Sequence, residues 1–118
     1  MNQSERLAKA DLSDLERAAL TRLIGGLQAL YGEKLKKVIL YGSRARRDFT
    51  EHSDLDVLIV LKDMQSRYRE IKKINDVAGP LSLTYNLLLS VFPISEQYFE
   101  EYQETNFLHQ VLKDGVTL

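Results

Sequence analysis

The sequence predicts an α/β fold in which helices flank a small mixed β-sheet. Three apolar runs, at residues 35–41, 54–61 and 83–92, have the length and composition of buried strands. Segments with apolar residues at helical spacing lie before, between and after these runs. Such an alternation of strands and helices is typical of α/β architecture.

The composition is that of an ordinary globular protein. The chain has 118 residues, 44% hydrophobic and 28% charged, which predicts a single domain from 1 to 118 with residues 1–10 as a loose leader. A net charge of −1 gives no global attraction to nucleic acid. The absence of cysteine excludes disulfides and thiolate metal sites. With no apolar run that suits a secretory signal or a membrane span, we expect a cytoplasmic protein.

The first helix is expected to begin after residue 12 and to end at Gly32. Ser13 and Glu16 form a capping-box pattern at its start, and glycine is the common residue at a helix C-terminus. Gly25-Gly26 within this helix costs about 1 kcal/mol per residue relative to alanine. Close packing of the helix on the sheet is the favoured explanation, and a functional hinge is the alternative.

The rest of the chain is expected to alternate in the same way. After the strands 35–41 and 54–61, a helix over Met64 to Ala78 would be capped by Asp63 and stopped by Gly79-Pro80. A long apolar strand, Leu83 to Phe92, would follow.

Two short helices are expected near the C-terminus. Ser95 can cap one that runs through Glu104, and Asn106 can cap another that runs through Lys113. Gly115 would end the second helix. The last three residues form either a short edge strand or a tail.

The most informative feature is the segment that joins the first two strands. Gly42-Ser43 ends the first strand, ten residues follow, and Asp54-Leu55-Asp56 opens the second. Gly42 allows a sharp turn and a close approach to a ligand, and Ser43 adds a hydroxyl donor. One helical turn from Ser43 to Arg47 would aim backbone N–H groups at a phosphate.

Charged residues complete this pattern. Arg44 and Arg46 place bidentate donors beside the glycine turn, where they can hold phosphate groups. Asp54 and Asp56 lie two apart on a strand, so their carboxylates leave the same face. Mg²⁺ usually binds one or two carboxylates together with substrate phosphates. Joined at this spacing, the residues predict a site for a nucleoside triphosphate with its magnesium ion.

The pattern G-S-x10-D-x-D resembles the signature of the nucleotidyltransferase superfamily typified by DNA polymerase beta. Gly42-Ser43-Arg44-Ala45-Arg46 is similar to the family's usual opening, G-S-x-A-R. The small single-domain form resembles the minimal nucleotidyltransferases (MNT proteins) of prokaryotes, and so does the ending Lys113-Asp114-Gly115-Val116. This resemblance implies a polymerase-beta palm-like fold, Asp54 and Asp56 as catalytic metal ligands, and ATP as the nucleotide. Many relatives have glycine where this chain has Arg47.

The resemblance also reveals a departure from the family. Active relatives use a third carboxylate from a later strand, but no Asp or Glu lies between Asp76 and Glu96. On a strand 83–92, Asn86 or Ser90 would stand at that position. A neutral side chain cannot act as a general base, so nucleotide binding is more firmly predicted than catalysis.

Two functions remain in competition. As an enzyme, the chain would transfer AMP from Mg²⁺-ATP to a hydroxyl, and its small size favours a protein acceptor over a drug or a nucleic acid. The resemblance to MNT antitoxins implies a HEPN-domain toxin as that partner. As a binding module, it would neutralise a partner by contact alone, with a vestigial nucleotide site. The sequence leaves the acceptor, the base preference and a homo-oligomer open.

Overall fold

The computed structural model describes residues 5, 12–42, 45 and 54–118. They contain a four-stranded sheet in the order β3-β2-β1-β4. β1 pairs antiparallel with both β2 and β4, whereas β2 and β3 are parallel. The sheet is therefore mixed, as the sequence predicted. The strands are β1 (Leu35–Tyr41), β2 (Leu55–Leu61), β3 (Leu89–Ser95) and β4 (Val116–Thr117).

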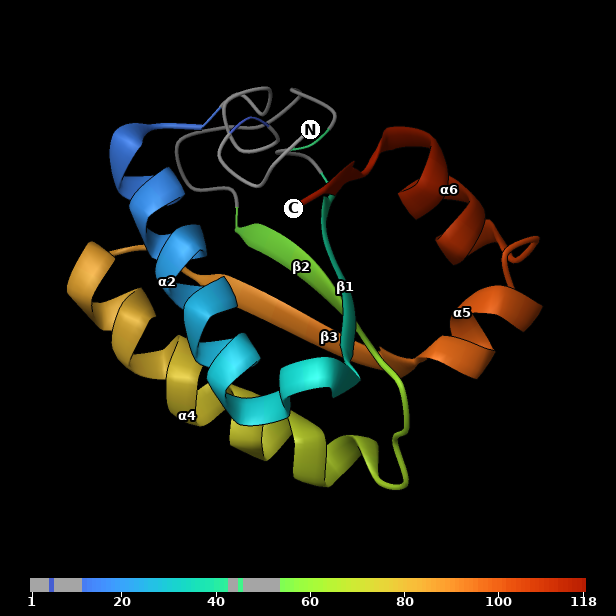
Figure 1. Cartoon of the computed structure of the whole chain (residues 1–118). Helices are drawn as coiled ribbons and strands as arrows, with labels where there is room; N and C mark the ends of the chain where they lie inside the picture. The colour runs from blue at the N-terminus through green and yellow to red at the C-terminus, as the bar shows by residue number, and fades with distance from the viewer. Residues whose placement is uncertain (1–4, 6–11, 43–44, 46–53) are drawn as a thin grey trace.

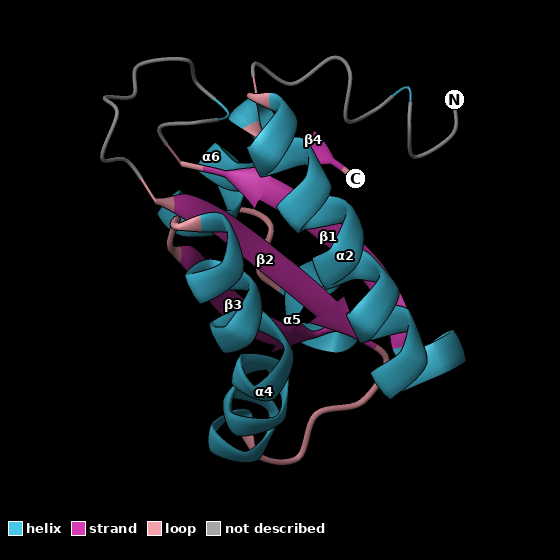
Figure 2. Cartoon of the chain, turned by 90° about the vertical axis from the view of Figure 1, so that its left-hand side faces the viewer, coloured by secondary structure: helices cyan, strands magenta, loops and turns pink. Residues whose placement is uncertain are grey.

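The helices lie on two sides of the sheet (Figure 1). α2 and α4 run side by side across one face, as the rotated view in Figure 2 shows. α5 and α6 lie on the other side. The helices are α2 (Asp14–Tyr31), the 3₁₀ turn η1 (Gly32–Lys34), α4 (Arg67–Tyr85), α5 (Glu96–Glu101) and α6 (Asn106–Asp114).

Two apolar clusters hold these layers together. The first cluster joins α2 and α4 to one face of β2, through Leu55, Val57 and Ile59. The second joins α5 and α6 to the opposite face, where Leu58 and Val60 point. Because successive strand residues alternate between faces, Asp56 belongs on the side of the second cluster. This parity decides which helices surround the carboxylate.

The first half of the chain follows the sequence predictions closely. The capping box is formed: the Ser13 backbone N–H donates to Glu16 Oε1 at 2.8 Å, and the Glu16 N–H donates to Ser13 Oγ at 3.1 Å. α2 ends at Gly32, whose φ is +56°. β1 and β2 lie where the apolar runs placed them.

The close packing of Gly25-Gly26 on the sheet that the sequence suggested is wrong, because Gly26 packs against a helix instead. A Cβ on Gly26 would lie 2.5 Å from Val77 Cγ1, on α4, so Gly26 brings the two helices together. The contact is with a helix and not with the sheet. Gly25 has nothing within 4 Å.

The helix predicted over 64–78 is wrong at both ends. Its N-cap is Ser66, whose hydroxyl accepts from the Arg69 N–H, and not Asp63. The helix then continues through Gly79 and Pro80 to Tyr85. Ile74, Ala78 and Leu81 form one buried stripe that crosses the Gly-Pro pair, so tertiary packing outweighs the local helix-breaking preference.

The strand predicted over 83–92 is consequently displaced. Residues 83–85 are helical, Asn86 adopts the left-handed conformation (φ +51°) that ends α4, and the strand runs from Leu89 to Ser95. The run of leucines carries no period that separates the end of a helix from the start of a strand. Packing of Leu81 and Leu89 in the same cluster places the boundary between them.

The C-terminal region matches the prediction with shifted ends. Ser95 caps α5, but the helix stops at Glu101, and Thr105 rather than Asn106 caps α6. Gly115 follows α6, and the last strand pairs with β1 through Leu40 and Val116. Of the two expected endings, the edge strand is therefore the observed one.

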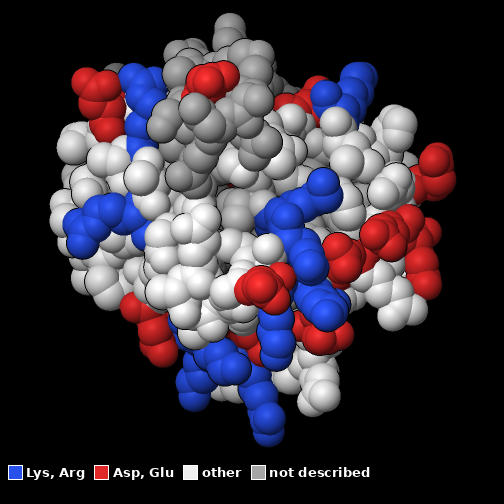
Figure 3. All heavy atoms as spheres, viewed as in Figure 1, with Lys and Arg blue, Asp and Glu red and all other residues white. Residues whose placement is uncertain are grey.

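Charge is unevenly distributed over the surface (Figure 3). In this view, basic side chains run through the middle and lower part, and acidic side chains gather on the right. The acidic residues of α5 are Glu96, Glu100 and Glu101. In the part of the chain that the structure describes, no helix has both the length and the apolar character that a membrane crossing requires.

Candidate functional site

Gly42 and Asp56 meet where β1 ends and β2 begins. Gly42 has a φ of +78°, a conformation that L-residues with a side chain rarely adopt. A Cβ added at Gly42 would overlap Asp56 Oδ2 and would lie 3.2 Å from Asp56 Cγ. The carboxylate thus lies directly over the glycine backbone. The expected proximity of Gly42 and Asp56 is observed, and only glycine permits it.

Asp56 has a neighbour on each adjacent strand. It is paired with Tyr41 across the antiparallel ladder and with Ser90 across the parallel one. Residues paired in this way place their side chains on the same face of the sheet. Asp56 is half-buried, whereas Ser90 is exposed.

The register of β2 and β3 shows which of the two candidate residues, Asn86 or Ser90, lies beside Asp56. Asn86 lies at the end of α4 and not on a strand, so the expectation that it faces Asp56 is wrong. Ser90, the other residue considered, is the one that lies beside Asp56. The residue paired with Asp56 on β3 therefore carries a hydroxyl and not a carboxylate.

Tyr41 belongs to an aromatic cluster on this face. Its ring packs edge-on against Phe107 with the centroids 5.5 Å apart, and Phe107 also contacts Phe92 at 5.5 Å. Burial raises the pKa of the Tyr41 hydroxyl, and the nearby Asp56 carboxylate raises it further. Tyr41 therefore stays neutral near neutral pH beside the carboxylate.

Several predicted site residues lie outside the described part of the chain. These are Ser43, Arg44 and Arg46. Ala45, between them, is helical and packs against the first apolar cluster. Asp54 is described and exposed, immediately before β2, where the Leu55 N–H donates to the Leu88 carbonyl at 3.0 Å.

A small pocket opens beside Gly42. It has a volume of about 180 Å³ and lies between the end of β1 and one side of α6. Tyr41 and Phe107 supply aromatic walls. Gln110 and Asp114, one helical turn apart, are hydrogen-bonded through Gln110 Nε2 and Asp114 Oδ2. The lining residues are Tyr41, Gly42, Phe107, Gln110, Val111 and Asp114.

Sequence reasoning missed Phe107, Gln110 and Asp114. Two signals were available. Asp114 lies in the last turn of its helix, where the helix dipole disfavours a negative charge, so helix stability does not explain it. The spacing of Gln110 and Asp114 also places both on one side of a helix.

The donor set fits a magnesium ion only in part. Asp54 and Asp56 are the type of ligand that Mg²⁺ prefers, and a triphosphate would supply the others. Among the residues described, no three His, Cys, Asp or Glu side chains gather into a group that could hold a metal on its own.

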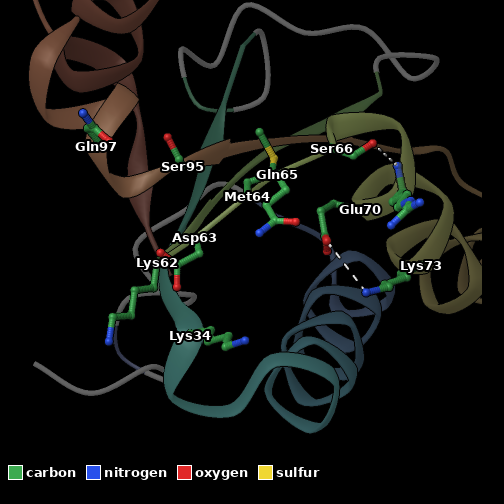
Figure 4. A pocket seen from close by; sticks show the side chains of 11 residues that line it. Lys34, Lys62, Asp63, Met64, Gln65, Ser66, Glu70, Lys73, Ser95 and Gln97 are labelled. Atoms are coloured by element: carbon green, nitrogen blue, oxygen red, sulfur yellow. Dashed lines mark hydrogen bonds and ion pairs between the residues drawn. The ribbon is translucent and has the colours of Figure 1, made fainter.

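A larger and more polar cavity lies at the opposite end of the sheet. It has a volume of about 590 Å³ and lies where β1 begins and where β2 and β3 end. Lys34 and Glu70 point toward the open space, whereas Lys62 points away (Figure 4). Glu70 Oε1 also lies 3.8 Å from Lys73 Nζ, so part of this charge is paired within the wall.

Comparison with known proteins gives concordant results. A family model described as the nucleotidyltransferase domain matches residues 20–117. Two proteins of Methanocaldococcus jannaschii, each named as a putative protein adenylyltransferase, are also similar. One is 34% identical over 103 residues, which are 87% of this chain and 97% of the relative. The other is 39% identical over 90 residues, which are 76% of this chain and 85% of the relative.

Solved structures show the same fold. A crystal structure from Sulfolobus solfataricus, described as a putative nucleotidyltransferase, matches with a TM-score of 0.62 and 18% identity, covering 97% of this chain and 83% of the other. A toxin–antitoxin structure with AMP-PNP matches with a TM-score of 0.54 and 18% identity, covering 80% and 68%. A mutant of the toxin–antitoxin MntA–HpeT matches with a TM-score of 0.52 and 21% identity over the same shares.

Proposed function

This chain belongs to the nucleotidyltransferase domain family, and we propose that it transfers AMP from Mg²⁺-ATP to a hydroxyl group of a partner protein. The observation that carries the proposal is the contact between Gly42 and Asp56. Because Gly42 has no side chain, its backbone can approach a phosphate closely, while the Asp56 carboxylate beside it can act as a metal ligand.

Each residue of the motif has a distinct role in this proposal. Gly42 and Ser43 form the phosphate cradle, and Arg44 and Arg46 hold the outer phosphates. Asp54 and Asp56 hold magnesium, which when bound would polarise the α-phosphate. The acceptor oxygen forms a bond to the α-phosphorus, the bond from that phosphorus to the β-phosphate oxygen breaks, and pyrophosphate leaves. The proton of the acceptor hydroxyl goes to a base.

This chain offers no carboxylate beside Asp56 on β3 that could act as the general base. Ser90 occupies the register position beside Asp56, and a hydroxyl cannot take up the proton. Solvent, the triphosphate or the partner protein would have to accept it. Because a positioned general base contributes roughly 10²–10⁴-fold, the isolated domain should be a slow enzyme.

A protein acceptor is favoured over the alternatives by size and by the names of relatives. Both similar archaeal proteins are named as protein adenylyltransferases, and two of the similar structures are toxin–antitoxin assemblies. We therefore propose that the partner is a toxin of the HEPN type and that this chain acts as its antitoxin in the cytoplasm. AMP transfer to a toxin hydroxyl, such as that of a tyrosine, would inactivate it.

The metal role can be tested with the double variant Asp54→Asn, Asp56→Asn. Removing two negative charges while keeping the side-chain shape should abolish the Mg²⁺-dependent part of ATP binding, measured by calorimetry with and without Mg²⁺. The thermal midpoint should change little, because Asp54 is exposed and Asp56 is half-buried at the end of the sheet. Equal Mg²⁺-dependent affinity in the wild type and the variant would remove the metal role from the proposal.

The second candidate is a binding module that neutralises its partner by contact, and the hydroxyl of Ser90 is the observation in its favour. The two functions separate when the protein and the product of its neighbouring gene are incubated with labelled ATP and Mg²⁺. Label on the partner supports the enzyme. Neutralisation of the partner without label supports the binding module.

The Ser90→Asp variant sharpens this test. A carboxylate beside Asp56 should raise transfer by about 10-fold or more if a base is the missing part. Asn86→Asp is the matched control, since Asn86 lies at the end of α4 and should give no gain. A wild-type domain that turns over rapidly by itself would show that no third carboxylate is needed.

A further inference from the structure

The pocket between β1 and α6 is not used by the phosphate chemistry proposed above. Its volume of about 180 Å³ lies below the roughly 300 Å³ at which pockets for drug-sized ligands begin. It therefore suits one planar group and not a whole nucleotide. Because Gly42 is part of its wall, a group seated there stays next to the proposed phosphate cradle.

The walls of the pocket suit a flat aromatic ligand. Tyr41 is half-buried, and Phe107 keeps 41% of its surface exposed although it contacts both Tyr41 and Phe92. An aromatic ring that is fixed by two neighbours and still exposed on one side is a ready stacking surface. Any nucleobase can stack on such a ring, because every base has a π-face.

The polar part of the pocket accepts hydrogen bonds. Gln110 donates its Nε2 to Asp114 Oδ2, so Gln110 Oε1 and Asp114 Oδ1 are the acceptors that the pair presents. Asp114 lies close to Gly42 in the fold, since both residues line the same pocket. A base that carries an amino group meets these acceptors, whereas an aromatic side chain without N–H groups does not.

From these contacts we infer that the pocket of Tyr41, Phe107, Gln110 and Asp114 binds the base of the nucleotide, stacking a purine on Phe107 and accepting from its exocyclic amino group. The inference rests on the proposed function, because the base can reach this pocket only if the phosphates occupy the turn at Gly42. It assigns adenine recognition to α6, far in sequence from the G-S-x10-D-x-D motif. The amino group is the feature that the Gln110–Asp114 pair would read.

The stacking part of the inference is tested with two ligands, Mg²⁺-ATP and Mg²⁺-tripolyphosphate, which lacks the base. Phe107→Ala should weaken ATP by about 5- to 150-fold and leave tripolyphosphate unchanged. Phe107→Leu keeps an apolar side chain for packing and removes the ring, so it should show the same selectivity if the first variant folds poorly. Tyr68→Ala, at an exposed tyrosine near the start of α4, is the control and should change neither affinity.

The amino group is tested with purine riboside triphosphate, which lacks it. The wild type should bind ATP more tightly than this analogue, and Asp114→Asn, which keeps the shape and removes the charge, should reduce the difference. Equal binding of the two nucleotides by the wild type would overturn the recognition of the amino group.

Failure of the inference differs from failure of the proposed function. If wild-type protein binds both ATP and tripolyphosphate and Phe107→Ala changes neither, the base lies elsewhere while the phosphate site stands. If neither ligand binds the wild type, the proposed function itself fails. Normal ATP affinity with impaired AMP transfer in Phe107→Ala would overturn the inference in another way, because the pocket would then receive the acceptor side chain.

Discussion

The two ends of the sheet differ in almost every property that is used to locate a functional site. The end at Lys34 and Glu70 has the larger cavity, about 590 Å³, with charged walls. The end at Gly42 and Asp56 has a pocket of about 180 Å³. Yet of these two pockets, only the smaller adjoins a glycine with a positive φ and an aromatic cluster. Volume alone would direct attention to the end that lacks Gly42 and Asp56.

Topology explains why the usual rule about strand ends does not help here. In parallel α/β sheets, ligands bind beyond the carboxyl ends of the strands. β2 and β3 both end at the large cavity, so the rule would again select it. Because β1 runs antiparallel to β2, the end of β1 and the start of β2 meet, and a turn and a carboxylate come together at the opposite edge.

Each end also contains a tyrosine beside a carboxylate. Tyr31 donates its hydroxyl to Glu70 Oε2 at 2.5 Å, and burial, this hydrogen bond and the Glu70 charge raise its pKa. The pKa of Tyr41 is also raised, mainly by burial and further by the charge of Asp56. At the polar end the carboxylate is thus engaged by a protein donor. At the glycine end, the Asp56 carboxylate lies against the backbone of Gly42.

The largest expected effect comes from filling the space over Gly42. In Gly42→Ala the new Cβ would overlap Asp56 Oδ2, and a φ of +78° would disfavour alanine, so the turn and the carboxylate must separate. Displacement by about 1 Å can lower a rate by about 100-fold, which is the loss of AMP transfer that we expect. Transfer assays with labelled ATP measure it.

Gly25→Ala is the matched control for this variant. Nothing lies within 4 Å of the position, so the substitution should leave transfer unchanged and stabilise α2 by about 1 kcal/mol. Full activity of Gly42→Ala would contradict the proposal that AMP transfer takes place at the Gly42 end of the sheet.

A second prediction concerns the helix pair that supports both ends. In Gly26→Ala the Cβ would lie 2.5 Å from Val77 Cγ1, and α2 and α4 would have to move apart. Overpacking of this kind costs about 1–3 kcal/mol, whereas the neighbouring Gly25→Ala should stabilise. Denaturant unfolding of both variants measures the difference. Equal stability of the two would mean that the helices separate without cost.

A smaller effect is expected from the tyrosine of the polar end. Tyr31→Phe removes the hydrogen bond to Glu70 and should cost about 1 kcal/mol of unfolding free energy at pH 8. The pKa of Tyr31 is raised in the folded state, so its stabilisation is fully present below the unfolded value of 10.0 and is lost as the pH rises above it. The difference between wild type and variant should therefore shrink above pH 10. A difference independent of pH would contradict the link to ionisation.

The smallest effect should come from the charges of the large cavity. Lys34→Gln and Lys62→Gln alter its walls without touching Gly42 or Asp56, and screening limits the long-range field of exposed lysines to about 10 Å at moderate salt. AMP transfer should stay within about twofold of wild type. A tenfold loss in either variant would place part of the nucleotide site at this end and would break the contrast between the two.

Local patterns were sufficient for some elements of the chain and insufficient for others. β1, β2 and both ends of α2 were predicted because their signals are short-range: continuous apolar runs, a capping box and a terminal glycine. The helix over Gly79-Pro80 was missed because its stability comes from a buried stripe that packs on the sheet and on α2. The sequence alone could not decide whether Asn86 or Ser90 lies beside Asp56, and the register of β2 and β3 shows that it is Ser90.

The sequence by itself determined the glycine turn, the paired carboxylates and their spacing, because these depend on residue identity and on the period of a strand. Only the tertiary structure decided which distant residues join them. Strand pairing brings Ser90 beside Asp56, and α6 places Asp114 in the pocket that Gly42 lines and adds Phe107 to the same face. Such contacts arise from hydrogen-bond register and side-chain packing between segments more than thirty residues apart, which no local pattern encodes.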